Sequence, residues 1–272
     1  MTDFQRTGPL SCSLRAANPG PMTLDGTNSY ILGAPGSGTV VVVDPGPLLE
    51  EHLAALAAAG PVELILVTHE HADHTEGSAR LHELTGAPVR AANPEHCHGG
   101  APLHDGELIR AAGVEIGVLA TPGHTADSVC FVLKDPALAD DAGATQVLTG
   151  DTVLGQGSTV ICYPDGRLGD YLGSLEKLLT IGSEGDPVAV LPGHGPVLPD
   201  LAAIAAAYRA HRQDRLAQVR AAVELLEKGG TQATAEAVTA AVYGDVPANL
   251  QGAAQLSVEA QLDYLRGATP AR

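Results

Sequence analysis

The chain has 272 residues, of which 44% are hydrophobic, so it can bury a sizeable core in one large domain or in a large domain with a small appendage. Aromatic residues make up only 3% and Trp is absent, so this core must be mainly aliphatic. The net charge of −17 disfavours nonspecific binding to nucleic acids and anionic membranes, and no uninterrupted apolar segment is long enough to span a bilayer.

Short apolar segments separated by Gly and Pro predict an α/β protein with many turns. Residues 1–26 are polar and turn-rich. Helices are expected at residues 48–59, 75–84 and 170–181, the second with Thr75 as its N-cap. Strands are expected at residues 29–32, 39–43, 62–67, 89–91, 113–120, 128–133, 145–148 and 187–191.

The character of the chain changes near residue 200. Residues 200–228 are rich in Ala, Leu and Arg and predict one long helix, and two more helices are expected at residues 234–242 and 252–267. Residues 200–272 hold 7 Lys and Arg against 8 Asp and Glu, so nearly all of the negative charge falls on residues 1–199. We therefore expect a main domain over residues 1–200 and a helical C-terminal domain over residues 201–272.

Candidate metal ligands crowd into the segment that follows the expected strand 62–67. Three imidazoles and a carboxylate lie within residues 69–74, and three further candidates each follow another apolar run. If these runs are neighbouring strands of one α/β sheet, all seven side chains meet at one edge of it. The seven candidates are His69, His71, Asp73, His74, His124, Asp151 and His194.

The chemistry of these side chains suits two Zn²⁺ ions, with Mn²⁺ or iron as open alternatives. His69 and His71 stand two residues apart, so in an extended segment they face the same way and can hold one ion. A turn after Ala72 can aim Asp73 and the next imidazole at a second ion, and one carboxylate, Asp151, can bridge both. Two metals about 3.5–4 Å apart can share a hydroxide, which is a nucleophile at neutral pH.

The pattern His-x-His-x-Asp-His, followed by Gly-His, Gly-Asp and Gly-His, resembles the metallo-β-lactamase-fold hydrolase superfamily. The resemblance implies an αββα sandwich and covers most of residues 20–200. It puts His69, His71 and His124 on the first zinc, with Asp73, His74 and His194 on the second and Asp151 bridging. It also implies that Asp44 supports the metal loops from outside the ligand set.

Two longer stretches are similar to the lactamase-beta-2-like branch of that superfamily, namely residues 18–30 and residues 150–159. Members of that branch carry a helical, winged-helix-like C-terminal appendage, and their animal relatives are described as single-strand endoribonucleases. Ser158 and Thr159 follow the bridging carboxylate in the second stretch. They either donate hydrogen bonds to a substrate or cap a turn.

The other histidines and the cysteines are expected to have structural rather than functional roles. His96-Cys97-His98 resembles a metal site, but no partner ligands are evident, and the remaining histidines (His52, His82, His104, His211) are expected at the surface. The four cysteines are widely spaced, with no Cys-x-x-Cys pair, which indicates a reducing, cytoplasmic setting. No secretory signal is visible at the N-terminus.

These features predict a binuclear zinc-dependent metallohydrolase in which a metal-bridging hydroxide attacks an ester-type bond and Asp73 both binds metal and orients the nucleophile. The substrate stays open between a small ester-type molecule and single-stranded RNA, so the alternatives are a thioesterase or lactonase of the glyoxalase II type and a single-strand endoribonuclease. A further alternative is a nucleic-acid-binding regulator with a structural metal site. Its support is a row of arginines that is equally typical of a solvated helix face, namely Arg209, Arg212, Arg215 and Arg220.

Overall fold

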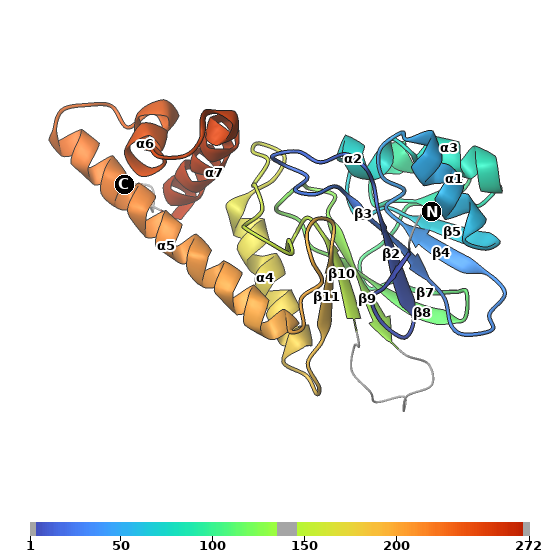
Figure 1. Ribbon diagram of the computed structural model, residues 1–272. Coiled ribbons are helices and arrows are strands. Elements are labelled where there is room, and N and C mark those ends of the chain that lie inside the picture. The colour runs from blue at the N-terminus through green and yellow to red at the C-terminus, as the bar shows by residue number, and fades with distance from the viewer. Residues whose placement is uncertain (1–3, 135–145, 269–272) are drawn as a thin grey trace.

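The computed structural model describes residues 4–134 and 146–268, and in them two β-sheets face each other between layers of helices (Figure 1). The first sheet is antiparallel from β1 to β4 and parallel from β4 to β6. Its strands lie in chain order: β1 (Gln5–Arg6), β2 (Ser11–Arg15), β3 (Asn28–Leu32), β4 (Val40–Val43), β5 (Val62–Leu66) and β6 (Val89–Arg90).

The second sheet is antiparallel except for the parallel pair β10 and β11. Its spatial order is β11-β10-β9-β8-β7, with β7 (Leu108–Ala111), β8 (Val114–Ala120), β9 (Val129–Lys134), β10 (Gln146–Gly150) and β11 (Ala189–Pro192). The expected strand 145–148 is β10, although Thr145 itself lies outside the described residues.

Alternating side chains fix the four layers, because successive residues of a strand point to opposite faces. Val41 and Val43 of β4 face the second sheet and pack in one cluster with Phe131, whereas Val42 faces the outer helices. The outer helices of the first sheet are α1 (Glu50–Ala58) and α3 (Ser78–Thr85), and those of the second sheet are α4 (Leu168–Gly182) and the first half of α5 (Leu201–Lys228). This is the αββα sandwich that the sequence motifs implied.

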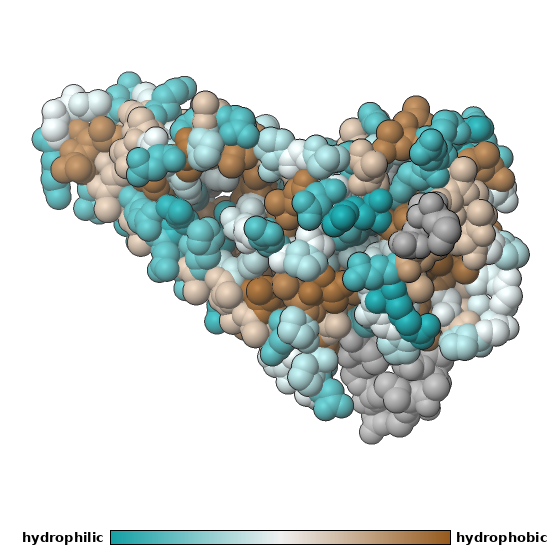
Figure 2. Space-filling view, viewed as in Figure 1, coloured by the Kyte–Doolittle hydropathy of each residue, from teal (hydrophilic) through white to brown (hydrophobic). Residues whose placement is uncertain are grey.

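The C-terminal part of the described chain is helical and contains no strand beyond β11. The helix α5 begins at Leu201 because the Asp200 side chain accepts a hydrogen bond from the Ala203 N–H at 2.9 Å. Beyond the sandwich, the second half of α5 packs with α6 (Ala235–Val242) and α7 (Gln251–Ala268) around a small separate hydrophobic core. The short η2 (Ala248–Leu250) lies between α6 and α7 in the chain. In Figure 2 a shallow saddle separates this helical tail, on the left, from the two-sheet body.

Two features of the N-terminal half go beyond or against the sequence analysis. Within residues 4–26, which are turn-rich as expected, β1 and β2 add two strands to the edge of the first sheet. The expected helix 75–84 is divided into α2 (Ala72–Thr75) and α3, so Thr75 ends a helical turn rather than capping a helix. The break occurs because the Gly77 N–H donates to the Gly46 carbonyl at 2.9 Å instead of to its own helix.

None of the helices within residues 4–134 and 146–268 is both long and apolar enough to cross a lipid bilayer.

We expect Tyr208→Phe to lower the free energy of unfolding by about 1–3 kcal/mol, because the Tyr208 hydroxyl satisfies both the N–H of Leu154, at 3.1 Å, and its carbonyl, at 3.2 Å. Urea denaturation followed by circular dichroism measures the difference. The matched control is Tyr264→Phe, because no hydrogen bond of that hydroxyl occurs within the described residues. Equal effects of the two substitutions would contradict this role of Tyr208.

Candidate metal centre

The candidate ligands follow the ends of four strands, but these strands belong to two sheets rather than to one. Residues 69–74 follow β5 of the first sheet. His124, Asp151 and His194 follow β8, β10 and β11 of the second sheet. The facing sheets bring all seven side chains together, so the expected convergence occurs between two sheets.

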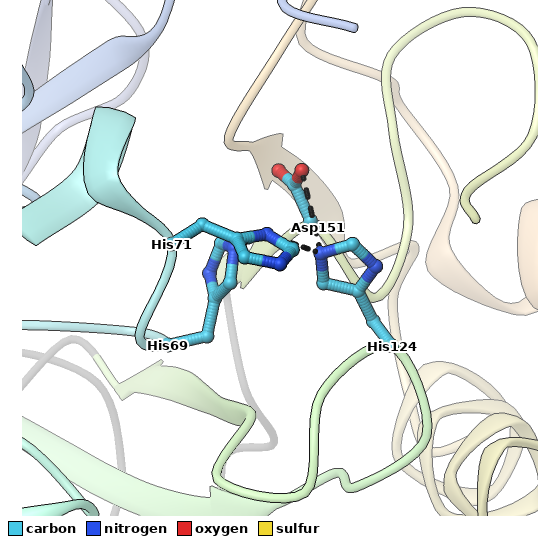
Figure 3. A group of neighbouring side chains, drawn as sticks. All are labelled: His69, His71, His124 and Asp151. Atoms are coloured by element: carbon cyan, nitrogen blue, oxygen red, sulfur yellow. Dashed lines mark hydrogen bonds and ion pairs between the residues drawn. The ribbon is translucent and has the colours of Figure 1, made fainter. Parts of the chain in front are cut away.

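Four of the side chains form a first group, in which every member offers a donor atom within 4.8 Å of the others: His69, His71, His124 and Asp151 (Figure 3). The Nδ1 atom of His71 lies 3.0 Å from Nε2 of His69 and 3.0 Å from Nε2 of His124. Asp151 Oδ2 lies 3.8 Å from the same His124 nitrogen. Three ring nitrogens and a carboxylate oxygen therefore point at one small space.

Asp73, His74 and His194 form a second group beside the first. Asp73 Oδ2 lies 3.4 Å from Nε2 of His74 and 3.2 Å from Nε2 of His194. Asp151 also reaches this group, with its Oδ2 3.4 Å from the His194 nitrogen and its Oδ1 3.5 Å from the His74 nitrogen. The carboxylate of Asp151 thus lies between the two groups, where a bridging ligand would be.

The far nitrogen of four of the five rings is held by a protein oxygen, which orients the near nitrogen toward the centre. His124 Nδ1 lies 2.7 Å from the Val160 carbonyl, and His194 Nδ1 lies 3.3 Å from the Gly26 carbonyl. Because a carbonyl only accepts, each of these nitrogens carries the proton and leaves Nε2 free to bind a cation. His69 Nδ1 lies 3.0 Å from the Thr68 hydroxyl, which can serve the same purpose.

Asp44 lies behind both groups, 2% exposed, at the end of β4. Its Oδ1 accepts from the Thr68 N–H at 2.8 Å, and its Oδ2 accepts from the Thr68 hydroxyl, also at 2.8 Å. The same Oδ2 lies 2.8 Å from Nδ1 of His74. One buried carboxylate therefore orients His74 directly and His69 through the Thr68 hydroxyl.

The two groups differ in charge. Burial, reinforced by the neighbouring imidazoles, holds the pKa of His69 well below its usual range. Burial also lowers the pKa of His124 to about 4, although Asp151 opposes it. In the second group burial lowers the pKa of His194, but Asp151 and Asp73 outweigh burial and raise it to about 10. Without a cation, protons on the second group balance its carboxylates.

Burial alone would raise the pKa values of Asp73 and Asp151, but His194 and His74 outweigh it and hold both below their usual range. Asp151 Oδ1 is buried and accepts no hydrogen bond from any described residue. Gly193 lets it sit there, since a Cβ on Gly193 would clash with that oxygen. An unsatisfied carboxylate oxygen facing imidazole nitrogens fits a divalent cation.

A cavity of about 400 Å³ opens onto these side chains. Its walls include Val160 and Cys162 of the main body, and Asn249, Ala253 and Leu256 of η2 and α7. The helical tail therefore forms one wall of the candidate active site.

The two candidate substrate-binding residues differ in placement. Ser158 is exposed and lines an adjoining cavity, whereas Thr159 is buried with its hydroxyl 3.3 Å from His124 Nδ1. Neither metal-binding group includes His96, Cys97 or His98, and His98 stacks on His82 instead. His52, expected at the surface, is buried, with Nε2 2.8 Å from the Ser29 hydroxyl.

Thr27 was missed by sequence reasoning, although it lies in the quoted stretch 18–30. Its buried hydroxyl donates to Asp73 Oδ2 at 2.8 Å, and Asn18 holds Thr27 in turn through its side-chain carbonyl and amide. A single threonine in a loop has no spacing pattern that identifies such a contact.

We expect Asp44→Asn to weaken zinc binding by about 10- to 100-fold, because an amide cannot accept all three of the hydrogen bonds that the carboxylate accepts. Competition with a zinc-chelating dye measures the affinity. The matched control is Asp105→Asn, because the Asp105 carboxylate also accepts a backbone N–H, from Ala120 at 2.7 Å, but lies outside both groups. Unchanged zinc affinity in Asp44→Asn would contradict the orienting role.

We expect zinc uptake by the metal-free protein at pH 7 to release protons, because His194, with its pKa raised to about 10, must become neutral to bind a cation. The release should shrink as the pH rises toward 10. Calorimetry in two buffers of different ionisation enthalpy counts the protons, and His194→Gln should release about one fewer. Equal proton counts for wild type and variant would refute the charge assignment of the second group.

Comparisons with known proteins identify the family of this chain. The family model of the metallo-beta-lactamase superfamily matches residues 22–194. The chain is 33% identical over 260 residues to an atrochrysone carboxyl ACP thioesterase of Aspergillus chevalieri, covering 91% of this chain and 77% of that protein. It is 31% identical over 261 residues to a beta-lactamase-like protein 2 homolog of Caenorhabditis elegans, covering 91% and 81%.

Among solved structures, a metallo-beta-lactamase family protein from Thermus thermophilus aligns with a TM-score of 0.74 at 26% identity, covering 96% of this chain and 95% of that one. This alignment extends over both the two-sheet body and the helical tail. As the sequence motifs predicted, the chain belongs to the metallo-beta-lactamase superfamily, whose members are typically metal-binding hydrolases.

Proposed function

We propose that this protein is a binuclear zinc hydrolase that cleaves a carboxylic ester-type bond, with thioesters as the favoured substrate class. The observation that carries the proposal is the placement of Asp151 between two groups of imidazole and carboxylate donors at the end of a cavity. His69, His71 and His124 would hold one ion, and Asp73, His74 and His194 the other.

Bound there, two zinc ions would acidify a water molecule and polarise the carbonyl oxygen under attack. The donor set of nitrogens and carboxylate oxygens suits zinc, and it also accepts iron or Mn²⁺. The orphaned oxygen of Asp151 and the outer hydrogen bonds to the rings support a preorganised site rather than one assembled by the metal.

The protein's own residues would position the nucleophile. The Thr27 hydroxyl donates a hydrogen bond to Asp73 Oδ2 and so fixes the orientation of this carboxylate. The carboxylate can in turn accept a hydrogen bond from the attacking water and hold that water in one orientation. The lowered pKa of Asp73 keeps it ionised for that task. Ala253 and Leu256 of α7 line the cavity on the side of the tail and give it an apolar wall there.

The walls of the cavity favour an acyl substrate over RNA. Met22, Val160 and Leu256 give the cavity apolar surface beside the ligands, which suits an acyl chain. The net charge of −17 opposes long-range attraction of a polyanion. The relative from Aspergillus chevalieri, named as a thioesterase acting on an acyl carrier protein, is consistent with this substrate class.

The proposal predicts about two zinc ions per chain by elemental analysis. It also predicts turnover of an acyl thioester that falls by about 10²- to 10⁴-fold in Asp73→Ala. The panel contains an acyl thioester, a lactone, nitrocefin and single-stranded RNA, and the matched control is Asp186→Ala, an exposed carboxylate on another loop.

Turnover of none of the four by the zinc-loaded wild type would reject the hydrolase. RNA binding that survives Asp73→Ala, without turnover, would instead support the regulator. RNA cleavage without thioester cleavage would support the endoribonuclease.

A further inference from the structure

A second cavity, of about 370 Å³, adjoins the metal centre and runs between the main body and the helical tail. It shares His124 and Asp151 with the first cavity, so the two cavities lie side by side at the candidate metal centre. Most of its wall is apolar, including Leu154, Val246 and Leu250. Apart from the shared His124, its histidine and arginine side chains come from one face of α5, which contributes His211, Arg212 and Arg215.

Arg212 is 5% exposed, although its position in the row of helix arginines suggested a solvated or nucleic-acid-binding face. Its guanidinium donates to the Thr159 carbonyl and lies 5.1 Å from the centre of the Tyr171 ring. Its Nε atom is buried without a hydrogen-bond partner, and no carboxylate of the described residues forms an ion pair with it. A buried charge in this state is costly unless something else compensates it.

Arg212 is buried without a carboxylate partner, although the chain is strongly acidic. Arg80, Arg90 and Arg209 are among the arginines that pair with carboxylates, and Arg209 lies on the same helix and reaches Glu176 at 2.7 Å. With 32 Asp and Glu against 15 Lys and Arg in the whole chain, a carboxylate partner is easy to supply. The guanidinium of Arg212 in the cavity wall nevertheless has no carboxylate partner among the described residues.

Arg215 lies one turn further along α5 and is also without a carboxylate partner in the described part of the chain. It donates to the Gln218 side chain at 2.9 Å and lies 5.0 Å from the centre of the Tyr243 ring. Burial, followed by the charges of Arg212 and Arg215, lowers the pKa of the neighbouring His211, although Asp214 opposes this shift.

We propose that Arg212 and Arg215 form an anion-binding subsite that holds a carboxylate or phosphate group of the substrate while its scissile bond lies at the metal centre. The inference rests on the proposed hydrolase function and narrows its substrates to those with an anionic group beside an apolar segment. Guanidinium groups suit both oxyanions because their N–H donors match two oxygens at once. The apolar wall would hold the hydrocarbon between the anion and the reacting carbonyl.

A purely structural role for Arg212 makes a different prediction. Arg212 holds the Thr159 carbonyl, and the Thr159 hydroxyl lies 3.3 Å from His124 Nδ1, so Arg212 could act only as a brace for that ligand. A brace would affect every substrate equally. A subsite affects only the substrates that carry the anion.

The experiment compares substrates that differ only in charge, using the zinc-loaded full chain. The thioesters of N-acetylcysteamine with hexanoate and with adipate differ by a terminal carboxylate. Hexanoyl-pantetheine and hexanoyl-4′-phosphopantetheine differ by a phosphate on the thiol side. The variants are Arg212→Gln, Arg212→Lys and Arg215→Gln, and the control is Arg220→Gln, an exposed arginine of the same helix that lies outside the cavity.

We expect Arg215→Gln to raise the KM of one anionic substrate by about 10- to 100-fold, with less than a twofold change for its neutral partner. Because Arg212 also holds the Thr159 carbonyl, Arg212→Gln should impair both substrates, but the anionic one by about 10-fold more. Which pair responds identifies the anion as the acyl carboxylate or the thiol-side phosphate. Arg212→Lys should restore part of the effect. Equal changes for charged and neutral substrates in both variants would overturn the subsite and leave Arg212 as a brace.

A binding measurement separates failure of the subsite from failure of the hydrolase. Calorimetry with adipate, hexyl phosphate and the neutral hexanamide needs no turnover. A wild-type preference for adipate or hexyl phosphate over hexanamide that Arg215→Gln abolishes supports the subsite even if no thioester is cleaved. Equal binding of all three ligands by the wild type would overturn the subsite. Weakened binding of single-stranded RNA in the arginine variants, with unchanged affinity for the small anions, would also overturn it.

Discussion

The candidate site depends on one buried carboxylate, that of Asp44. It accepts hydrogen bonds from the backbone and hydroxyl of Thr68 and contacts Nδ1 of His74, so it joins the end of β4 to the loop after β5. Without it His74 would lose the partner that fixes which of its nitrogens faces the cavity, and Thr68 would lose the contact that holds it beside His69. One ring in each donor group is thus oriented by a carboxylate that lies behind both groups.

The site also requires that donor residues from the two sheets of the sandwich meet. The loop after β5 supplies four donors from the first sheet, and the ends of β8, β10 and β11 supply three from the second. The shared core, with Val43 on one side and Phe131 on the other, holds the sheets face to face. Packing of apolar side chains far from the ligands therefore sets how closely the donors from the two sheets approach one another within each group.

Much of this arrangement could be predicted from sequence, because the donors are dense and each follows a strand of apolar residues. The αββα layering came from the resemblance of the motif order. The paired sheets could not be told from a single sheet by apolar runs alone, since a run shows that a strand is buried but not which strand it pairs with. Thr27 and the carbonyls of Gly26 and Val160 carry no pattern, because their roles arise from contacts distant in sequence. Arg212 was misread because helical spacing alone does not reveal which face is covered.

The placement of α7 has a consequence for how this protein could diversify. Ala253 borders both hollows, yet none of the seven donor residues comes from this helix. A tilt of α7, a shift of this helix by one turn or a bulkier side chain on it would change the shape of the substrate cavity. The candidate metal ligands would stay in place. Substrate selectivity and reactivity thus depend on separate parts of one polypeptide. Substitutions in the helical tail could therefore change the substrate specificity without changing the residues that carry out the reaction.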